Sequence, residues 1–322
     1  MNFEAIRALA ANDLQAVDRE IAARLKSDVA LIDQLGNHII HSGGKRLRPL
    51  IVVLGAHAFG YEGTAHIRLA AIVEFIHTAT LLHDDVVDAS ELRRGQSTAN
   101  AIWGNEASVL VGDFLYSRAF EMMVEVGSMR VMEILARTTN TIARGEVLQL
   151  LNCHDPYTTE ERYIEVIRSK TAKLFEAAAQ LAAVIGGQNG ATEAAMAAYG
   201  MHLGTAFQLI DDALDYGRGN QELGKNVGDD LAEGKPTLPL IHALREGTAE
   251  QCALIRAAIE EGGLARIEAV VDAIESTGSI AYTARRAEEE AEYARRALEA
   301  IPDSPRKQAL LDLAFFSVHR NH

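Results

Sequence analysis

The chain has 322 residues, of which 48% are hydrophobic and 24% charged, and its formal net charge is −14. This length and composition suit a soluble globular protein with a substantial core. The acidic balance argues against nucleic acid as a partner, because binding to phosphates requires a basic surface. It also argues against electrostatic attachment to an anionic membrane.

The apolar residues recur with a helical period along the whole chain. None of the six prolines lies between residues 50 and 155, which favours long helices over a β-sandwich. Capping boxes are predicted at Thr158–Glu161 and Thr248–Gln251. No strand, linker or repeat is expected, so the prediction is one all-α domain, a helical bundle over residues 1–322. The predicted helices span residues 3–25, 29–41, 49–59, 65–92, 106–127, 129–152, 159–185, 192–217, 237–246, 249–262, 264–277, 279–300 and 305–320.

The cellular compartment is predicted from the cysteines and the apolar segments. Cys153 and Cys252 match neither a disulfide framework nor a metal site, which favours a reducing compartment. The charged N-terminal residues lack the apolar region of a signal peptide. The longest uncharged run, 194–210, contains His202 and Gln208 and reads as a buried helix. We therefore expect a cytoplasmic protein without stable membrane insertion.

A basic turn, GGKRLRP, precedes the helix that is predicted to begin at Pro49. Lys45, Arg46 and Arg48 would oppose the helix dipole there, whereas an anion would be stabilised both by these cations and by the helix N-terminus. The turn is therefore either a substrate anion site or a basic surface turn.

An acidic motif, Asp84-Asp85-Val86-Val87-Asp88, ends the apolar helix that begins near residue 65. Asp84 and Asp88 share a helix face because they are four residues apart. A solvated acidic face is the alternative, but the apolar residues before the motif indicate a buried helix. His77 lies two turns earlier on nearly the same face. Arg93 and Arg94 follow the motif closely, and arginine pairs well with phosphate oxygens.

A second acidic motif repeats this pattern 127 residues later, since 211 − 84 = 127. Asp211, Asp212 and Asp215 again follow an apolar helical run, and Gln208 faces them from one turn earlier. Oxygen ligands alone suit Mg²⁺, which bridges carboxylates to substrate phosphates, whereas zinc would require Cys or His beside the acids. The two motifs together predict an enzyme that uses Mg²⁺ to bind a phosphorylated substrate.

With these motifs, the chain resembles the trans-polyprenyl diphosphate synthases, and most of all the bacterial octaprenyl diphosphate synthases. GGKRLRP, FIHTATLLHDDVVD, GDFLYSRAF, SKTAKLFEAA, GTAFQLIDDALD and GKNVGDDLAEGKPTLPL carry the resemblance. It implies an isoprenoid synthase fold with a central cavity, usually as a homodimer. It also implies condensation of isopentenyl diphosphate with an allylic diphosphate, farnesyl diphosphate being the expected primer, to octaprenyl diphosphate for the ubiquinone or menaquinone side chain.

The resemblance also implies roles for individual residues. The six motif aspartates would hold Mg²⁺, and Thr171 and Gln208 would lie near the allylic cation. Lys170 taken alone would be read as a surface lysine. Isopentenyl diphosphate would be held by Lys45, Arg48, His77 and Arg94, and the allylic diphosphate would contact Arg93, Lys170, Lys225 and Lys235.

Product length is expected to depend on residues just upstream of the first motif. Ala79 and Thr80 are small and leave an elongation tunnel open, which argues against short products. Thr80 shares a face with Asp84, whereas the role of Ala79 comes from the resemblance alone. Met123 is a candidate for the tunnel floor, although such a residue is more often ordinary core.

Four other functions are weighed against this one. A synthase of another chain length, from thirty to fifty carbons, would share all of these motifs. A terpene cyclase would lack the second diphosphate site formed by Lys45, Arg48 and His77. A noncatalytic subunit of a heteromeric synthase would have lost one acidic motif, and a purely structural bundle would not place six acids beside apolar helices.

Overall fold

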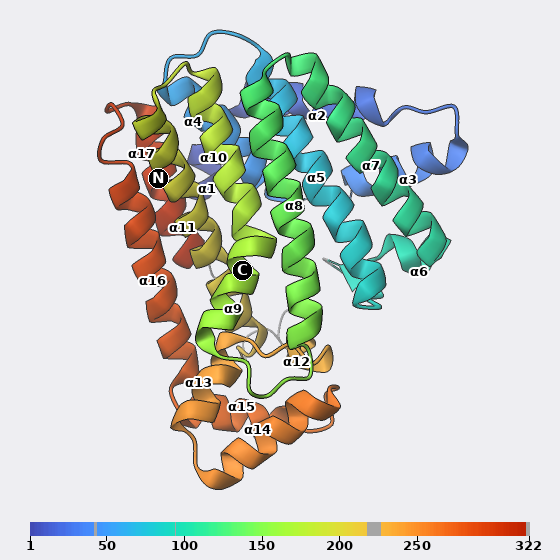
Figure 1. The fold of residues 1–322 in the computed structure, drawn as a ribbon, viewed down its shortest axis with the longest axis vertical. Coiled ribbons are helices and arrows are strands. Elements are labelled where there is room, and N and C mark those ends of the chain that lie inside the picture. The colour runs from blue at the N-terminus through green and yellow to red at the C-terminus, as the bar shows by residue number, and fades with distance from the viewer. Residues whose placement is uncertain (42–43, 94, 218–226, 320–322) are drawn as a thin grey trace. The chain divides into compact units, whose positions relative to one another are not determined.

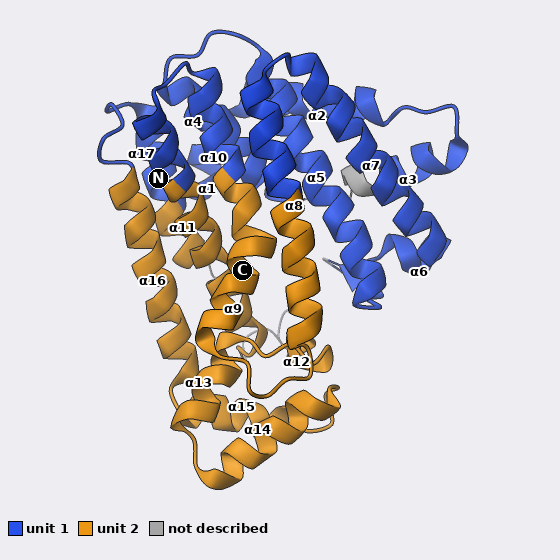
Figure 2. Ribbon diagram, viewed as in Figure 1, with its two compact units in different colours: residues 1–139, 177–197, 298–313 blue, residues 140–176, 198–297, 314–322 orange. Residues whose placement is uncertain are grey.

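The computed structural model describes residues 1–41, 44–93, 95–217 and 227–319, with only the backbone for 37 and 39–41. Helices form nearly all of the regular structure in these ranges, so the predicted all-α fold is confirmed (Figure 1). By its internal contacts the chain divides into two compact units (Figure 2). Unit 1 contains residues 1–139, 177–197 and 298–313, and unit 2 contains residues 140–176, 198–297 and 314–322. The single domain over 1–322 stays a prediction, since these contacts do not test independent folding.

Unit 1 is built around helix α5, which packs against α2, α4 and α7. By length and apolar composition α5 could cross a membrane, but 67% of its most apolar stretch is buried, as in the core helix of a folded unit. The elements that lie wholly in unit 1 are α1 (Phe3–Ala8), α2 (Ala11–Leu25), α3 (Ala30–His41), α4 (Leu47–Ala58), α5 (Ala65–Val87), β1 (Leu92–Arg93), β2 (Gln96–Ser97), α6 (Ala99–Trp103) and α7 (Asn105–Val126).

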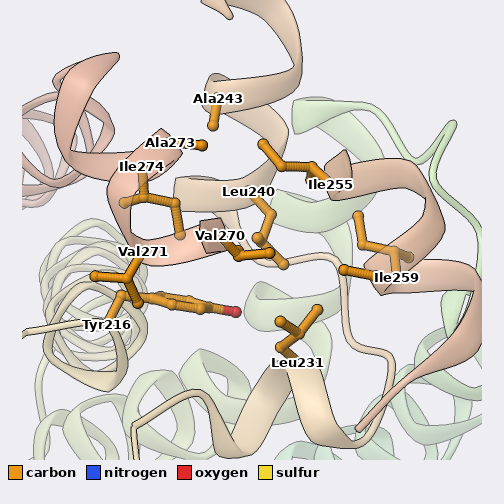
Figure 3. Close-up of a cluster of buried hydrophobic side chains, with 11 residues drawn as sticks. Tyr216, Leu231, Leu240, Ala243, Ile255, Ile259, Val270, Val271, Ala273 and Ile274 are labelled. Atoms are coloured by element: carbon orange, nitrogen blue, oxygen red, sulfur yellow. The ribbon is translucent and has the colours of Figure 1, made fainter. Parts of the chain in front are cut away.

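Unit 2 has a hydrophobic core in which Tyr216 packs with Leu231, Leu240 and Val270 (Figure 3). Tyr216 directly follows Asp215, so this core fixes the chain where the second acidic motif ends. Wholly in unit 2 are α9 (Glu160–Ile167), the π-helical segment η1 (Arg168–Ala172), α12 (Asp229–Ala232), α13 (Leu238–Glu246), α14 (Ala249–Glu261), α15 (Ile267–Ser276) and α16 (Ser279–Ala297). Both units include residues of α8 (Met129–Asn152), α10 (Lys173–Ile185), α11 (Gly190–Asp215) and α17 (Pro305–Val318).

One of the two predicted capping boxes is confirmed. Thr248 and Gln251 exchange side-chain and backbone hydrogen bonds at the start of α14. The box predicted at Thr158 is wrong by one residue, because Thr159 adopts the extended N-cap conformation and accepts a hydrogen bond from the Arg162 N–H.

The predicted helix over residues 3–25 is interrupted, since α1 ends at Ala8 and α2 begins at Ala11. The buried residues Ile6, Ala10 and Leu14 keep four-residue spacing across this break. The apolar pattern therefore could not reveal it, because a helical face continues on both sides.

The helix predicted to reach residue 92 ends at Val87, and the short β1–β2 pair that follows was not expected. Asn100 donates its side-chain N–H to the carbonyls of Asp85 and Ser90, at 3.0 and 3.1 Å. Ala89 takes a left-handed conformation with φ of 50°. A side chain twelve residues beyond Asp88 thus helps fix where the helix ends, and no local sequence pattern reports that.

Candidate active site

Each acidic motif lies at the C-terminal end of a long apolar helix, the first on α5 in unit 1 and the second on α11 in unit 2. A helix C-terminus carries partial negative charge, so carboxylates placed there repel the backbone dipole as well as one another. Such clusters are stabilised by added cations. Each unit also has a pocket, lined in part by charged side chains, that includes one aspartate of its own motif.

The unit 1 pocket, of about 60 Å³, follows one face of α5. Glu74 lies eleven residues before Asp85, which is about three helical turns, so both side chains project the same way. This spacing was visible in the sequence but Glu74 was not singled out. The lining residues are His38, Arg46, Glu74, His77, Thr78, Leu81, Leu82, Asp85, Arg93, Gln96, Ser97, Thr98 and Ala99.

The first motif contributes one deeply buried acid, Asp85, to this pocket. Asp85 is 4% exposed, and Arg93 on β1 donates to its Oδ1 from Nε at 2.9 Å and from Nη2 at 2.7 Å. Burial raises the pKa of Asp85, although the hydrogen bonds and charge of Arg93 act in the opposite direction. The negative charge at this position is therefore only partly compensated, and further positive charge would stabilise it.

Arg46 also lines this pocket, although the sequence predicted it only as part of the basic turn. It precedes α4 with a left-handed φ of 50° and forms an ion pair with the buried Glu74. Non-glycine residues adopt this conformation at a cost, which is often found at functional sites. The Arg46–Glu74 pair therefore fixes the junction between Lys45 and the first turn of α4, which contains Arg48.

The other residues predicted for the first substrate have different surroundings. His77 lines the unit 1 pocket, whereas Lys45 and Arg48, both half-buried, lie at the start of α4 and are not among its lining residues. Arg94 lies outside the described residues. Thr80 donates its hydroxyl to the His77 carbonyl at 2.7 Å. Ala79 on α5 and Met123 on α7 are fully buried, and these two helices pack together.

The unit 2 pocket is larger, about 140 Å³, and brings together five predicted site residues: Lys170, Thr171, Gln208, Asp212 and Lys235. Asp211 and Asp215 end α11 nearby but do not line it, and Lys225 lies outside the described residues. The remaining lining residues were not predicted. They are Gln149, Asn152, Thr158, Tyr163, Val166, Ile167, Asp230, Pro236 and Thr237.

A chain of hydrogen bonds holds the buried Asp212. The Thr171 hydroxyl donates to Gln208 Oε1 at 3.0 Å, and Gln208 Nε2 donates to Asp212 Oδ1 at 2.7 Å. The Tyr163 hydroxyl donates to Asp212 Oδ2 at 2.5 Å. Both carboxylate oxygens are thus fixed by neutral donors, which leaves the charge itself uncompensated by these partners.

Burial and neighbouring acids raise the carboxyl pKa values of the second motif more strongly than burial raises that of Asp85 in the first. Burial, followed by the nearby charge of Asp230, raises the pKa of Asp212 well above its ordinary range. The same two causes raise the pKa of Asp215 to about 8, although Asp215 accepts hydrogen bonds from the N–H groups of Asp229 and Asp230, both at 3.2 Å. Acidic side chains that resist ionisation in this way would be stabilised by a divalent cation.

Lys170 and Thr171 lie on the π-helical segment η1, where the chain bulges between α9 and α10. Two glycines permit close approach of neighbouring helices. A Cβ on Gly204 would lie 2.6 Å from Ala172 Cα, and a Cβ on Gly145 would lie 2.8 Å from the backbone nitrogen of Lys170. Single π-helical turns often occur at functional sites. Lys170 forms an ion pair with Glu146 at 2.7 Å, so it is a positioned side chain rather than a free surface lysine.

Two pocket residues that were not predicted had signals in the sequence. Tyr163 precedes Lys170 by seven residues, about two turns of helix, which places both on one face. Asp230 belongs to the GDD sequence after the second motif, a third acidic group that received no role. Lys235, five residues further on, forms an ion pair with Glu233.

The donors in both motifs suit a divalent cation with oxygen ligands, because they are carboxylates with raised pKa values in Asp85, Asp212 and Asp215. A mainly helical chain with two such clusters, each beside a pocket with basic side chains, is an enzyme architecture for anionic substrates. Residues 29–276 match the polyprenyl synthetase family. The chain belongs to this family, whose members depend on metal ions, and it is a prenyltransferase.

Several similar proteins support this membership. The octaprenyl diphosphate synthase of Escherichia coli is 56% identical over 322 residues, covering 100% of both chains. That of Haemophilus influenzae is 55% identical over 323 residues, covering 100% of this chain and 98% of its own. The solved polyprenyl synthase of Caulobacter crescentus, complexed with calcium and isoprenyl diphosphate, is 47% identical with a TM-score of 0.95, covering 100% of this chain and 98% of its own. The predicted isoprenoid synthase fold is confirmed.

Proposed function

We propose that this enzyme is an octaprenyl diphosphate synthase, which extends farnesyl diphosphate with isopentenyl diphosphate units for a ubiquinone or menaquinone side chain. The observation that carries this proposal is identity of 55–56% over the full length of this chain to two octaprenyl diphosphate synthases. The two carboxylate clusters and two polar pockets support it, since the reaction uses two diphosphates.

Magnesium is the metal we propose, held by Asp84, Asp85, Asp88, Asp211, Asp212 and Asp215. Bound Mg²⁺ supplies positive charge that stabilises the departing diphosphate. The solved relative contains calcium, another hard cation that prefers oxygen ligands. The oxygen-only donors and raised carboxyl pKa values described above favour this class of ion.

The residues of the unit 2 pocket would act on the allylic substrate. Lys170 and Lys235 would bind its diphosphate, with Lys225 and Arg93 as further contacts. The hydrogen bonds from Thr171 to Gln208 and from Gln208 to Asp212 fix the Gln208 amide, so its oxygen can face an allylic cation without reorganisation. As the carbon–oxygen bond breaks, the isopentenyl double bond attacks the cation, and a proton is then lost from the new unit.

The basic residues of unit 1 would bind isopentenyl diphosphate. His77 lines the unit 1 pocket, Lys45 lies directly before the Arg46–Glu74 ion pair, and Arg48 lies in the first turn of α4. Arg94 would complete this set. Charge-assisted hydrogen bonds from such side chains are short and strong, so they can hold a diphosphate in a fixed orientation.

Product length would depend on the buried face between α5 and α7. Ala79 is fully buried and small, and Thr80 satisfies its hydroxyl within its own helix, so neither places bulk in the path of a growing chain. Met123, fully buried on α7, would limit the tunnel.

We also propose a cytoplasmic homodimer. On α7, Leu110 and Val124 are 66% and 67% exposed, and their spacing of fourteen residues, about four turns, places both on one side of the helix. Exposed apolar side chains that share a face favour a protein contact. Light scattering should then give twice the monomer mass, and Leu110→Glu should reduce it to the monomer mass.

Incubation of the purified protein with farnesyl diphosphate, isopentenyl diphosphate and Mg²⁺ tests the proposal. Dephosphorylated products sized by chromatography should centre on forty carbons. Chelation should abolish the reaction, and added Mg²⁺ should restore it. Products of thirty, thirty-five, forty-five or fifty carbons would assign another chain length, and cyclic hydrocarbons would indicate a terpene cyclase.

A further inference from the structure

Three metal-ligating side chains meet in unit 1 away from the acidic motifs: Asp13, His57 and His66. Asp13 lies in the first turn of α2, His57 in the last turn of α4 and His66 at the start of α5. A tight turn at Gly60, with φ of 69°, reverses the chain between α4 and α5. Histidines nine residues apart, 66 − 57 = 9, are thereby brought together.

The donor atoms of this cluster all lie within 4.8 Å of one another. His57 Nε2 is 2.6 Å from Asp13 Oδ2, and His66 Nε2 is 3.6 Å from Asp13 Oδ1. The two imidazole rings stand edge to face with centroids 5.0 Å apart. Tyr61 also stands edge to face with His66, at 5.8 Å between ring centroids.

The burial of His66 is not explained by the close ion pair between Asp13 and His57. Its side chain is 5% exposed, and neither ring nitrogen forms a hydrogen bond within the part of the chain that the structure describes. Burying an unsatisfied polar group is unfavourable, so such a group calls for an explanation. The Asp13–His57 contact satisfies those two residues and leaves His66 unsatisfied.

The spacing of the donor atoms suits a tetrahedral ion. Bonds of about 2.0–2.2 Å at tetrahedral angles place neighbouring ligand atoms roughly 3.3–3.6 Å apart. His66 Nε2 lies 3.6 Å from Asp13 Oδ1, which is in this range. His57 Nε2 lies 2.6 Å from the other carboxylate oxygen, Oδ2, so an ion bound through Oδ1 requires this His57–Asp13 contact to open. Two imidazoles with one carboxylate are ligands for Zn²⁺ and related transition metals, whereas Mg²⁺ prefers oxygen alone.

We propose that Asp13, His57 and His66 form a binding site for a transition-metal ion of the Zn²⁺ class, with water in the fourth position. The site joins α2, α4 and α5. It is separate from the first acidic motif, because His66 and Asp84 are 18 residues apart on one helix, or about 27 Å. Its role is to hold these helices together rather than to act on substrate.

Co²⁺ is the probe for this site, since its visible absorption distinguishes tetrahedral from octahedral coordination. The full-length protein, stripped of metal by a chelator, is titrated with Co²⁺ in excess Mg²⁺ so that the carboxylate motifs remain saturated. We expect one tetrahedral Co²⁺ per chain, displaced by equimolar Zn²⁺. His66→Ala should weaken binding about 100-fold or more, because losing even an outer-sphere partner costs about 10–100-fold. His319→Ala, near the C-terminus, is the matched histidine control.

Asp13→Asn covers the case in which His66→Ala does not fold, because it preserves side-chain shape while removing the anionic ligand. Zn²⁺ should raise the Tm of the wild-type protein by several degrees, and the rise should be lost in Asp13→Asn. The proposal is overturned if wild-type protein gives no tetrahedral Co²⁺ spectrum, if His66→Ala leaves that spectrum unchanged, or if Zn²⁺ stabilises Asp13→Asn as much as the wild type.

Discussion

The two pockets hold their buried carboxylates in different ways. In unit 1, Asp85 receives two hydrogen bonds from the guanidinium of Arg93. In unit 2, Asp212 is held by the neutral donors Tyr163 and Gln208 while the charge of Asp230 opposes its ionisation. Asp85 therefore has part of its countercharge in direct contact, whereas Asp212 has only neutral hydrogen-bond donors and depends more on added cations. Two acidic motifs with similar sequences thus have different electrostatic surroundings.

The largest effect is expected from removing a motif carboxylate. Asp84→Ala and Asp211→Ala should each lower turnover by at least about 100-fold, because a lost ligand withdraws several kcal/mol of leaving-group stabilisation. Steady-state rates at saturating substrate and Mg²⁺ measure this. The exposed Asp28→Ala in unit 1 and Asp272→Ala in unit 2 are matched controls that should keep full turnover. A motif variant with more than a tenth of wild-type turnover would remove that residue from the metal site.

A substitution at Ala79 should change product length and leave the carboxylates of both motifs and the basic residues of both pockets unaltered. Ala79→Tyr places an aromatic ring on the fully buried face of α5, where a growing chain cannot displace it without overpacking the core. With farnesyl diphosphate as primer, products should stop at about twenty carbons, because the first condensation survives and further elongation is blocked. Ala79→Ser, which adds one atom, should still give long products. Full-length chains from Ala79→Tyr at the normal rate would mean that elongation follows another helix face.

Replacing Tyr163 tests whether Asp212 depends on neutral hydrogen-bond donors. Tyr163→Phe removes one of the two side-chain donors that hold Asp212 and leaves a buried carboxylate oxygen without that hydrogen bond. The free energy of unfolding in urea should fall by about 1–3 kcal/mol. Tyr157→Phe, which alters an exposed tyrosine of the same unit, should change nothing. An unchanged stability in Tyr163→Phe would show that Asp212 does not depend on this donor.

Most of the fold was predictable because the apolar residues of amphipathic helices recur with the helical period. The capping box at Thr248 was predictable from its residue types. The missed features depend on tertiary contacts. The end of α5 is fixed by Asn100, and the break after Ala8 preserves the apolar spacing. Neither leaves a local pattern in the sequence.

The site was predictable to the extent that its residues occur in motifs. The unit 2 pocket gathers Lys170, Thr171, Gln208, Asp212 and Lys235 as one set. Tyr163 was missed because a tyrosine in an amphipathic helix reads as ordinary core, and its partnership with Asp212 forms only in the folded unit. The unequal compensation of the two motifs was likewise invisible, since burial and neighbouring charges determine pKa values.

The smallest expected effect is a pH dependence of stability. Asp215 has a folded-state pKa of about 8 against an ordinary value of 3.8, so the folded state binds this proton more tightly than the unfolded state. The metal-free protein should therefore lose stability as the pH rises from 3.8 to about 8. Mg²⁺ favours the charged carboxylate, so it should raise the Tm more at pH 8 than at pH 6. Thermal unfolding in chelator and in Mg²⁺ measures the difference, and Asp215→Asn should reduce it. An equal rise at both pH values would contradict this account of the second motif.

The central claim is that the unit 1 pocket binds isopentenyl diphosphate and the unit 2 pocket binds the allylic diphosphate. It is tested most directly by comparing His77→Ala with Lys170→Ala in steady-state assays that vary each substrate in turn. One lost charge-assisted phosphate contact is worth about 1.5–3 kcal/mol, or about 10–150-fold in KM. His77→Ala should raise the KM for isopentenyl diphosphate and leave that for farnesyl diphosphate nearly unchanged. Lys170→Ala should do the reverse. Equal increases for both substrates in either variant would contradict the assignment of one diphosphate to each pocket.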